Sequence, residues 1–328
     1  EPQGVLAGAP LSRIQGPRAA LRLVAEPLIE AEMTLRELVA SNVEDISSVS
    51  LHLVNAGGKR LRPAMTALGA QAVGFDRPLA RLMCVGELIH LGSLLHDDVV
   101  DGADRRRGQV AAHLQYGNAA TILSGDYCLA RAMLLASEEA GGDAARELAR
   151  AVTEMAEGEV MQLRWAGNLS CDVQTYLQWI ERKSAALIAW CVSAGAWSQG
   201  ETQYASSLAR FGRGVGVAFQ ITDDVLDYRS GTGKNPGADL RERKVTLPLL
   251  RAMEKDPEIR SILARGEPDD LVVQELLARV EDTGALDQAL EHAKSLVWDA
   301  TDALSDLPPG EAVEALAVLG RYLVERVS

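Results

Sequence analysis

The sequence predicts an all-α protein built on a bundle of long helices. Apolar residues recur at helical spacing over several long stretches, and no convincing run of alternating β-branched residues lies between them. With 328 residues and 47% hydrophobic content, the chain can bury a large core. The predicted helices cover residues 19–40, 79–100, 119–136, 144–163, 176–197, 205–226 and 286–304.

We expect one domain, because the breaks between these stretches are short clusters of Gly and Pro rather than linkers. The first residues have the composition of a loose terminus. The expectation is therefore a flexible N-terminal segment at residues 1–15, followed by a single domain at residues 16–328. The breaks fall at residues 57–58, 141–142, 231–237, 266–268 and 307–310.

Charge and cysteine content exclude some classes of protein. The 33 basic and 46 acidic side chains leave a net charge of −13, which argues against a nucleic-acid binder but not against a small anionic substrate. The four cysteines are scattered without a CxxC pair, and neither a bilayer-spanning apolar run nor a secretory signal is visible. These features predict a soluble, cytoplasmic protein.

Two copies of one acidic pattern are the most informative feature of the chain. Asp97-Asp98-Val99-Val100-Asp101 and Asp223-Asp224-Val225-Leu226-Asp227 each lie at the end of an apolar helical stretch. Because positions i and i+4 share a helix face, the first and last aspartates of each copy point the same way. Packed face to face, the two helices would gather about six carboxylates around one cleft, where like charges need a cation between them. Carboxylates suit Mg²⁺, which is usually completed by substrate phosphates, so the pair predicts a metal-bridged diphosphate site.

A solvated acidic helix face is the ordinary explanation of a single such pattern. It does not explain two copies inside apolar runs, because buried carboxylates need partners. Basic residues nearby predict the anion-binding side of the site. Residues 57–63 (Gly-Gly-Lys-Arg-Leu-Arg-Pro) open a helix after a turn, and the helix N-terminus adds its dipole to Lys59 and Arg62. Taken alone, this segment is equally well explained as a solvated basic turn.

Further candidates lie on helix faces and in a Gly-rich loop. His90 stands seven residues before the first Asp pattern and shares its helix face, although a lone His is more often structural. Three arginines at residues 105–107 can grip phosphate oxygens, but they cannot all face one cleft. Lys183-Ser184 falls in a helical stretch, and Lys234 and Lys244 lie in the Gly-rich loop after the second Asp pattern. A mobile loop that carries lysines beside an anion site is a plausible lid.

A series of short motifs follows along the chain. They are residues 57–63, residues 90–101 (His-Leu-Gly-Ser-Leu-Leu-His-Asp-Asp-Val-Val-Asp), Arg106-Arg107-Gly108, Gly125-Asp126, Gly158-Glu159 with Gln162, Lys183-Ser184, Phe219-Gln220 before the second Asp pattern, Gly233-Lys234, and residues 244–248 (Lys-Val-Thr-Leu-Pro). In this order they resemble the trans-isoprenyl diphosphate synthases, the polyprenyl synthetase family, from about residue 20 to residues 322–326. The resemblance implies an isoprenoid synthase fold, an all-α bundle around a central cavity, usually as a homodimer. Long-chain octaprenyl and heptaprenyl diphosphate synthases are the type it is most similar to.

The resemblance also implies roles for individual residues. Mg²⁺ on an allylic diphosphate would be held by Asp97, Asp98, Asp101, Asp223, Asp224 and Asp227. That diphosphate would contact Arg106, Lys183, Lys234 and Lys244. Isopentenyl diphosphate would be held by Lys59, Arg62, His90 and Arg107. The catalytic group would comprise Lys183, Ser184 and Gln220, the last two lining the reaction centre.

The implied reaction suits these side chains. Cleavage of the allylic C–O bond places charge on pyrophosphate, which metal ions and fixed Lys and Arg side chains stabilise. Amide and hydroxyl dipoles stabilise the allylic cation while closure of the site excludes water. The isopentenyl double bond then attacks, and a proton is lost to pyrophosphate. The product would be destined for a membrane although the protein is soluble.

Three segments depart from the family pattern. Residues 110–113 read Val-Ala-Ala-His where many members have Pro-Thr before the His. Lys183-Ser184 replaces Lys-Thr and keeps the hydroxyl. Glu242-Arg243-Lys244 replaces Glu-Gly-Lys, and the loss of the glycine predicts either a stiffer loop or an added cation.

Small residues before the first Asp pattern predict a long product. Ser93 and Gly92 stand four and five residues before Asp97, where short-chain relatives tend to have bulky aromatics. The tunnel for the growing chain should therefore continue past Ile89. At ~5.4 Å per helical turn it would admit roughly six to ten isoprene units, the length of a quinone side-chain precursor. Met133 is a candidate floor of this tunnel, and ordinary core filling is the alternative.

Three other functions fit parts of the pattern. A class I terpene cyclase would share the first Asp pattern, but it needs neither a second copy nor the basic residues assigned to isopentenyl diphosphate. A non-catalytic partner subunit typically loses one Asp pattern, whereas this chain keeps both. A geranylgeranyl or farnesyl diphosphate synthase is the nearest rival, because pocket depth also depends on helices that the sequence does not place.

Overall fold

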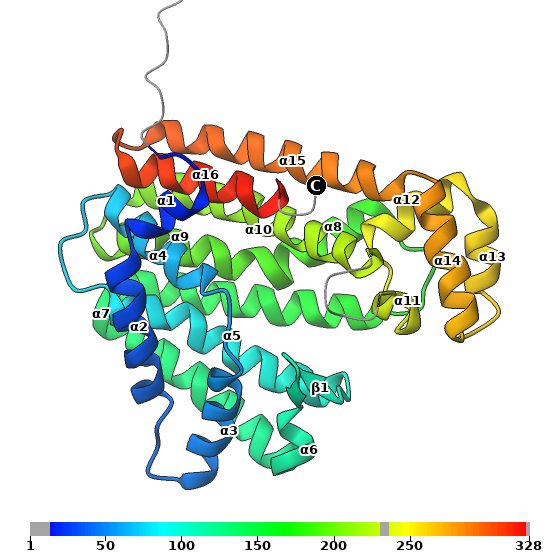
Figure 1. Ribbon diagram of the computed structural model, residues 1–328. Coiled ribbons are helices and arrows are strands. Elements are labelled where there is room, and N and C mark those ends of the chain that lie inside the picture. The colour runs from blue at the N-terminus through cyan, green and yellow to red at the C-terminus, as the bar shows by residue number, and fades with distance from the viewer. Residues whose placement is uncertain (1–13, 230–235, 326–328) are drawn as a thin grey trace, which may run out of the picture.

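The computed structural model describes residues 14–229 and 236–325. Its long helices lie side by side and run roughly along one direction, with shorter helices packed at both ends of the bundle (Figure 1). This nearly all-helical architecture confirms the predicted fold class.

Helices supply almost all of the regular structure of the described chain. In the first half they are α1 (Pro17–Arg22), α2 (Ala25–Leu38), α3 (Glu44–Asn55), α4 (Leu61–Ala72), α5 (Ala80–Val100), α6 (Ala112–Tyr116) and α7 (Asn118–Trp165). In the second half they are α8 (Val173–Ile180), α9 (Ala186–Ser198), α10 (Thr202–Tyr228), α11 (Ala238–Arg241), α12 (Leu247–Lys255), α13 (Pro257–Leu263), α14 (Asp270–Asp282), α15 (Ala285–Asp302) and α16 (Glu311–Glu325). A π-helical turn, η1 (Glu181–Ala185), and a 3₁₀ turn, η2 (Ala303–Asp306), complete the set.

Strongly periodic stretches are helical as predicted. The helices α5, α10 and α15 agree closely with the predicted stretches 79–100, 205–226 and 286–304. A helix also opens inside residues 57–63, where α4 begins at Leu61. Helices α3, α6, α11 to α14 and α16 were not predicted. The 3.6-residue period of the apolar side chains thus predicted the long helices but not most of the short ones.

The break predicted at residues 141–142 is confirmed as a bend, whereas the bends inside stretches 19–40 and 176–197 were not predicted. Stretches 119–136 and 144–163 are both parts of α7, in which Gly141 has a non-helical backbone with φ 83° and ψ −179°. Stretch 176–197 comprises α8, η1 and α9, and stretch 19–40 comprises α1 and α2. The apolar period continues across a bend, so it does not reveal where a helix changes direction.

The described residues contain a short hairpin, although no strand was predicted. Strand β1 (Arg105–Arg106) pairs antiparallel with β2 (Gln109–Val110). The two residues between them, Arg107 and Gly108, have φ values of 51° and 79°. Two-residue hairpin loops commonly need positive φ at both central positions, and Asn-Gly is their strongest sequence signal. The Arg-Gly pair is a weaker signal.

Helix α9 is the centre of the core. Residues 186–196 are all buried, and α9 packs against α4, α7 and α10. A helix that is apolar on every side is buried on every side. The buried apolar side chains of the described chain form one connected cluster, which runs from Ile14 to Val324. The helices that carry the Asp patterns therefore pack on a common core.

Helix α7 is long and apolar enough, by length and composition only, to cross a membrane, and 39% of its most apolar window is buried. This differs from the expectation that no apolar run reaches such a length. In the structure α7 packs against α5 and α9, which places it within the helical bundle.

Candidate active site

The two Asp patterns lie at the C-terminal ends of α5 and α10. Asp97 and Asp98 are in the last turn of α5, and Asp101 caps the helix, its N–H donating to the Asp97 carbonyl at 2.8 Å. Residues 223–227 occupy the corresponding end of α10. The two helices are not packed face to face as expected, because α9 lies against both of them.

Negative charge gathers around Asp97. Burial raises the pKa of Asp97 to about 6; Glu159 and Asp101 add to this rise, and Lys183 opposes it. Among the described residues, no three Asp, Glu, His or Cys side chains lie close enough to hold a metal ion as they stand. The carboxylates of the two Asp patterns are thus farther apart than the expected group of about six around one cleft. The donor set still fits a hard cation, since the outer side chains of both patterns offer carboxylate oxygens.

The second aspartate of each pattern has a partner of its own. Asp98 is fully buried, and its Oδ1 accepts a hydrogen bond from Arg106 Nε at 2.6 Å. Asp224 accepts hydrogen bonds from the Tyr176 hydroxyl at 2.7 Å and from Gln220 Nε2 at 2.8 Å. Burial raises the pKa of Asp224 to about 7, although these two hydrogen bonds lower it. Each of these two carboxylates thus holds a neighbouring polar group, and a metal-ligand role for either one stays a prediction.

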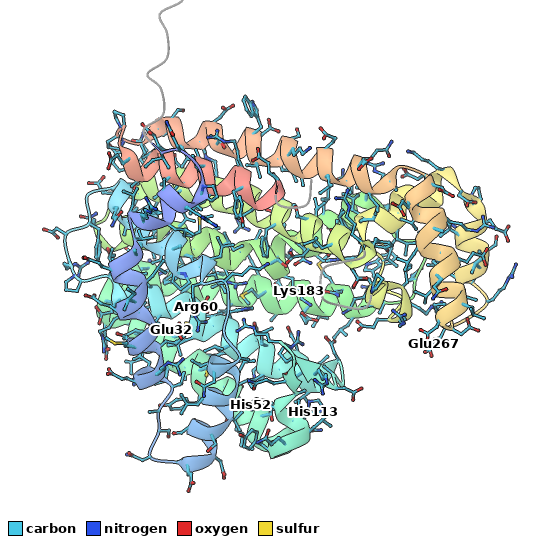
Figure 2. All side chains as sticks on the ribbon, viewed as in Figure 1. Glu32, His52, Arg60, His113, Lys183 and Glu267 are labelled. Atoms are coloured by element: carbon cyan, nitrogen blue, oxygen red, sulfur yellow. The ribbon has the colours of Figure 1, made fainter. Side chains whose placement is uncertain are left out.

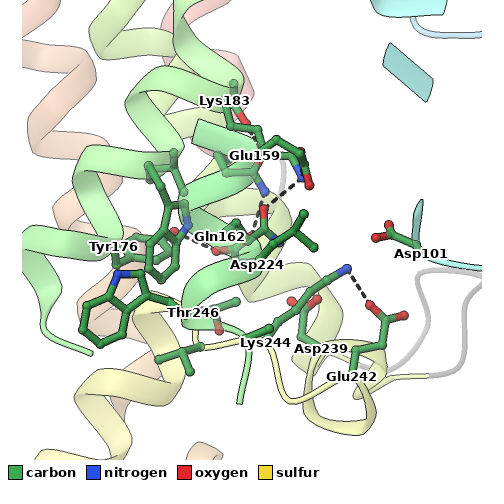
Figure 3. Close-up of a pocket in the computed structure, with 18 residues that line it drawn as sticks. Asp101, Glu159, Gln162, Tyr176, Lys183, Asp224, Asp239, Glu242, Lys244 and Thr246 are labelled. Atoms are coloured by element: carbon green, nitrogen blue, oxygen red, sulfur yellow. Dashed lines mark hydrogen bonds and ion pairs between the residues drawn. The ribbon is translucent and has the colours of Figure 1, made fainter. Parts of the chain in front are cut away.

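A cavity of about 400 Å³ lies beside the second Asp pattern (Figure 3). One part of its wall is polar and charged, with Asp101 and Asp224 as its members from the two Asp patterns. Another part is aromatic and comes from Trp165 and Trp179, at the end of α7 and on α8. The cavity therefore combines ionic groups with a surface that excludes water.

A π-helical turn presents Lys183 and Ser184 to this cavity. The turn comes close to α7 at Gly158, where a Cβ would lie 2.5 Å from the backbone nitrogen of Lys183. As a result, Lys183 Nζ lies 2.6 Å from the Glu159 carboxylate and donates to Gln162 Oε1 at 2.9 Å. Single π turns inside helices frequently occur at functional sites.

A chain of hydrogen bonds fixes the amide of Gln220. Ser184 Oγ donates to Gln220 Oε1 at 2.8 Å, and Gln220 Nε2 donates to Asp224. The buried Tyr176 hydroxyl donates to the other oxygen of the same carboxylate. Gln220 therefore has one defined orientation, with its carbonyl oxygen next to the Ser184 hydroxyl.

Lys244 reaches the cavity from the segment that follows α11 (Figure 3). Its Nζ lies 2.5 Å from the Glu242 carboxylate. Burial opposes its charge, but Glu242, Asp239 and Asp101 together raise the pKa of Lys244. Burial and the nearby aspartates of the second pattern hold the pKa of Asp239 well above its usual range. The other lysine predicted for this segment, Lys234, lies outside the described residues.

The residues assigned to the isopentenyl side also come together. Arg107 Nη2 lies 3.3 Å from His90 Nε2, and the same guanidinium donates to the Gly57 carbonyl. Burial, together with Arg62 and Arg107, lowers the pKa of His90 well below its usual value, so the ring is neutral. Arg62 Nε is buried without a hydrogen-bond partner in the described part of the chain, and Lys59 is exposed in the turn before it.

Ion pairs hold the segment that carries Lys59 and Arg62. Arg60 has a positive φ of 49° and lies 2.6 Å from the Glu32 carboxylate and 2.9 Å from that of the buried Glu87. Glu32 and Arg60 are neighbours where α2 passes the start of α4 (Figure 2). These contacts tie the N-terminus of α4 to α2 and α5.

The three consecutive arginines have three different partners. Arg105 donates to the Gly108 carbonyl at 2.9 Å, within the hairpin itself. Arg106 binds the buried carboxylate of Asp98, and Arg107 contacts His90. The expectation that they cannot all face one cleft agrees with this arrangement.

Comparisons with known proteins show the family of this chain. The model of the family described as polyprenyl synthetase matches residues 43–280. The octaprenyl diphosphate synthase of Haemophilus influenzae is 37% identical over 297 residues, which cover 87% of this chain and 90% of that protein. The chain belongs to the polyprenyl synthetase family.

Two further relatives of this polyprenyl synthetase extend the similarity over nearly the whole chain. The all-trans-nonaprenyl-diphosphate synthase (geranyl-diphosphate specific) of Rhodobacter capsulatus is 36% identical, over 93% of this chain and 96% of that protein. The polyprenyl synthase of Caulobacter crescentus, whose crystal structure contains calcium and isoprenyl diphosphate, matches with a TM-score of 0.90 and 37% identity. That match covers 96% of this chain and 99% of the other. The protein is thus a prenyltransferase of isoprenoid biosynthesis, a polyprenyl diphosphate synthase that elongates prenyl chains.

The residues predicted to set the product length of this polyprenyl synthetase do not line the cavity described above. Gly92 faces α7, where a Cβ would lie 2.9 Å from the Gly125 carbonyl oxygen. Ile89 is fully buried, and Ser93 and Met133 are half-buried. Helix packing therefore accounts for the small size of Gly92, and a tunnel past Ile89 stays a prediction.

Two residues of the site in this polyprenyl synthetase, Tyr176 and Asp239, were not predicted from the sequence. Glu159 was part of a quoted motif but had no predicted role. Tyr176 stands seven residues before Lys183, so a shared helix face was a usable signal. Glu159 follows Gly158 within a quoted motif. Asp239 lies in a short irregular segment, where no periodic pattern marks it.

Proposed function

We propose that this polyprenyl synthetase condenses isopentenyl diphosphate head to tail with an allylic diphosphate, in the presence of Mg²⁺, and releases a long all-trans polyprenyl diphosphate. The observation that carries the proposal is the mixture of charges around one cavity. Lys183 and Lys244 reach it beside Asp101 and Asp239. Lysines suit the phosphate groups of a diphosphate, and carboxylates suit a metal bound to it.

In this proposal the outer aspartates, Asp97, Asp101, Asp223 and Asp227, hold the metal. When bound, Mg²⁺ stabilises the charge that develops on the leaving pyrophosphate. Asp98 and Asp224, which the sequence also marked as ligands, are assigned to hold Arg106 and Gln220. The calcium in the Caulobacter polyprenyl synthase structure supports a divalent cation here.

The allylic diphosphate would bind Arg106, Lys183 and Lys244, with Lys234 as a further predicted contact. In the described structure, Lys183 and Lys244 are paired with Glu159 and Glu242. When the diphosphate binds, its oxygens would replace part of this pairing with the two glutamates. Because both lysines already form ion pairs, they would be charged before the substrate binds. Fixed cations of this kind stabilise charge without reorganising during the reaction.

Isopentenyl diphosphate would bind Lys59, Arg62, His90 and Arg107. The buried Nε of Arg62 supports this assignment, because it has no hydrogen-bond partner among the described residues and can donate to a ligand. Neutral His90 adds a hydrogen bond rather than a charge. Arg60 would act through its ion pairs with Glu32 and Glu87, which keep the segment in place.

The reaction centre in this proposal lies at Ser184 and Gln220. As the allylic C–O bond breaks, its electron pair leaves with pyrophosphate, and the oxygen dipoles of these two side chains stabilise the cation. Trp165 and Trp179 keep water away from it. The double bond of isopentenyl diphosphate forms the new C–C bond, and the proton lost in that step goes to pyrophosphate.

A long product is the preferred outcome, since the octaprenyl and nonaprenyl diphosphate synthases above are relatives at 37% and 36% identity. The product would be a quinone side-chain precursor of roughly six to ten units, by the tunnel length per turn. A geranylgeranyl or farnesyl diphosphate synthase is the alternative. The close packing of Gly92 on Gly125 and the full burial of Ile89 favour that shorter product.

The proposed assembly is a cytoplasmic homodimer of single-domain chains that extend over residues 16–328. One connected core supports the single domain. The exposed apolar side chains of Leu123 and Leu134 on α7, 61% and 49% accessible, support a partner surface there. A non-catalytic subunit of a heteromeric synthase is the alternative, which the retention of both Asp patterns disfavours. The polyprenyl diphosphate that the homodimer releases would pass to a membrane.

Product analysis tests the function. The purified protein would be incubated with Mg²⁺, farnesyl diphosphate and labelled isopentenyl diphosphate, and the dephosphorylated products would be sized. A ladder that ends at roughly thirty carbons or beyond, as expected for an open tunnel of two or more turns, supports the long-chain proposal. A product that stops at about twenty carbons keeps the reaction and overturns the tunnel. No incorporation by folded protein overturns the catalytic proposal in favour of a partner subunit.

A further inference from the structure

Arg243 occupies a backbone position that suits glycine. Its φ is 52°, in the left-handed region where a side chain is strained and glycine is not. An arginine in this conformation needs a contact that offsets the strain.

The offsetting contact is with Gly167, in the turn between α7 and α8. The Gly167 N–H donates to the Arg243 carbonyl at 3.0 Å, and Arg243 Nη2 donates to the Gly167 carbonyl at 3.3 Å. A Cβ on Gly167 would lie 3.4 Å from Arg243 Cζ, so the guanidinium lies directly over the glycine. We call this reciprocal contact the Arg243–Gly167 clasp.

The clasp joins two walls of the cavity. Trp165 and Ala166 line the cavity immediately before Gly167, and Lys244 lines it immediately after Arg243. Arg243 is not itself part of the lining, and its Nε is buried without a hydrogen-bond partner among the described residues. The side chain therefore acts on the walls of the site and not on a ligand.

We infer that Arg243 is a positioning residue, which holds Lys244 at the diphosphate through the Arg243–Gly167 clasp. The inference rests on the proposed contact between Lys244 and the allylic diphosphate. On the other side, the Lys244 N–H donates to the Asp239 carbonyl at 2.8 Å, so the segment is held from both directions. The residues assigned to isopentenyl diphosphate come from the segment before α4, from α4 and α5, and from the hairpin, which the clasp does not touch.

Arg243→Gly is the informative variant, because it removes the guanidinium and relieves the backbone strain at the same time. We expect the KM for farnesyl diphosphate to rise about tenfold, as for loss of other groups that orient a binding residue. The KM for isopentenyl diphosphate should stay unchanged. Arg243→Lys keeps one donor for the Gly167 carbonyl and should restore most of the lost affinity. A merely structural role would lower kcat and weaken both substrates together, which overturns the inference.

Arg260→Ala is the matched control. Arg260, on α13, donates to the Leu169 carbonyl in the same turn between α7 and α8, but α13 contributes no residue to the cavity wall. This variant should leave both KM values unchanged. A rise in the KM for farnesyl diphosphate equal to that of Arg243→Gly would show that any loosening of the turn has the same effect, and it would overturn the specific role of Arg243.

Two further measurements distinguish a failure of this inference from a failure of the proposed function on which it rests. An unchanged KM for farnesyl diphosphate in Lys244→Ala overturns the proposed diphosphate contact itself. A raised KM in Lys244→Ala together with an unchanged KM in Arg243→Gly overturns the clasp alone. Amide hydrogen exchange at Gly167 reports the clasp without substrate: we expect faster exchange in Arg243→Gly, and unchanged exchange there also overturns the inference.

Discussion

The two Asp patterns are alike in sequence but differ in what surrounds their middle carboxylates. Asp98 is paired with a cation, Arg106, and its second oxygen has no hydrogen-bond partner in the described chain. Asp224 accepts hydrogen bonds from two neutral groups, the Tyr176 hydroxyl and the Gln220 amide. A repeated motif therefore does not imply a repeated role. The partner decides whether the carboxylate balances a charge or orients an amide.

The helical turns before the two patterns differ as well. Gly92 and Ser93 precede the first pattern, whereas Ala218 and Phe219 stand at the matching positions before the second. Small side chains allow α5 to approach α7 closely at Gly92. The first pattern thus follows a turn of small residues, and the second follows a turn with a bulky aromatic.

The largest effect is expected where the two patterns are proposed to act alike. Asp97→Ala and Asp223→Ala should each lower kcat by about a thousandfold, because each removes fixed charge at the pyrophosphate. Steady-state kinetics at saturating Mg²⁺ measure this loss. Asp143→Asn, a change on the exposed surface of α7, should leave kcat unchanged. If either alanine variant keeps more than about a tenth of the activity, the outer aspartates do not act as a pair.

Replacing the middle aspartates should separate the two patterns by stability. Asp98→Asn leaves the Arg106 guanidinium unpaired, and since that side chain is only 28% exposed we expect a loss of about 3 kcal/mol in the free energy of unfolding. Asp224→Asn disturbs hydrogen bonds from neutral donors and leaves no cation without its counter-charge, so it should cost about 1 kcal/mol. Chemical denaturation of both variants makes the comparison. Equal losses would show that the nature of the partner does not matter.

Tyr176→Phe tests the second pattern alone. It removes one of the two hydrogen bonds that hold Asp224, so the Gln220 amide loses part of its support. We expect kcat to fall about tenfold, with both KM values unchanged, as for loss of an outer hydrogen-bond partner. Tyr228→Phe is the matched control, since this buried tyrosine contacts Thr246 instead. A similar loss of kcat in both variants would contradict a specific role for Tyr176.

Ser93→Phe tests the difference between the turns and should have the smallest effect on rate. It places an aromatic side chain four residues before the first pattern, where Phe219 already stands before the second. If the growing chain passes this turn, the product should become shorter by one or more isoprene units, at ~5.4 Å per turn. Chromatography of the dephosphorylated products measures the change. A product of unchanged length would rule out a tunnel along this face of α5.

Much of the fold was predictable because it rests on long amphipathic and apolar stretches. The helices that carry Asp97 and Asp223 were predicted almost to their ends. The hairpin at Arg106 was missed because two-residue strands have no periodicity to detect. The split of residues 176–197 at the π turn was missed because the apolar period continues across it.

The sequence by itself determined the helical class, the two Asp patterns, the basic residues that accompany them and the family. These depend on local spacing and on the chemistry of each side chain, which the order of residues contains. Only the tertiary structure decided which partner each residue has. Asp98 and Asp224 occupy equivalent positions in two closely similar patterns, yet one contacts Arg106 and the other Tyr176. The Arg106 contact depends on the hairpin that turns the chain back toward α5 only eight residues later, and the Tyr176 contact joins residues 48 apart that packing around the shared core brings together.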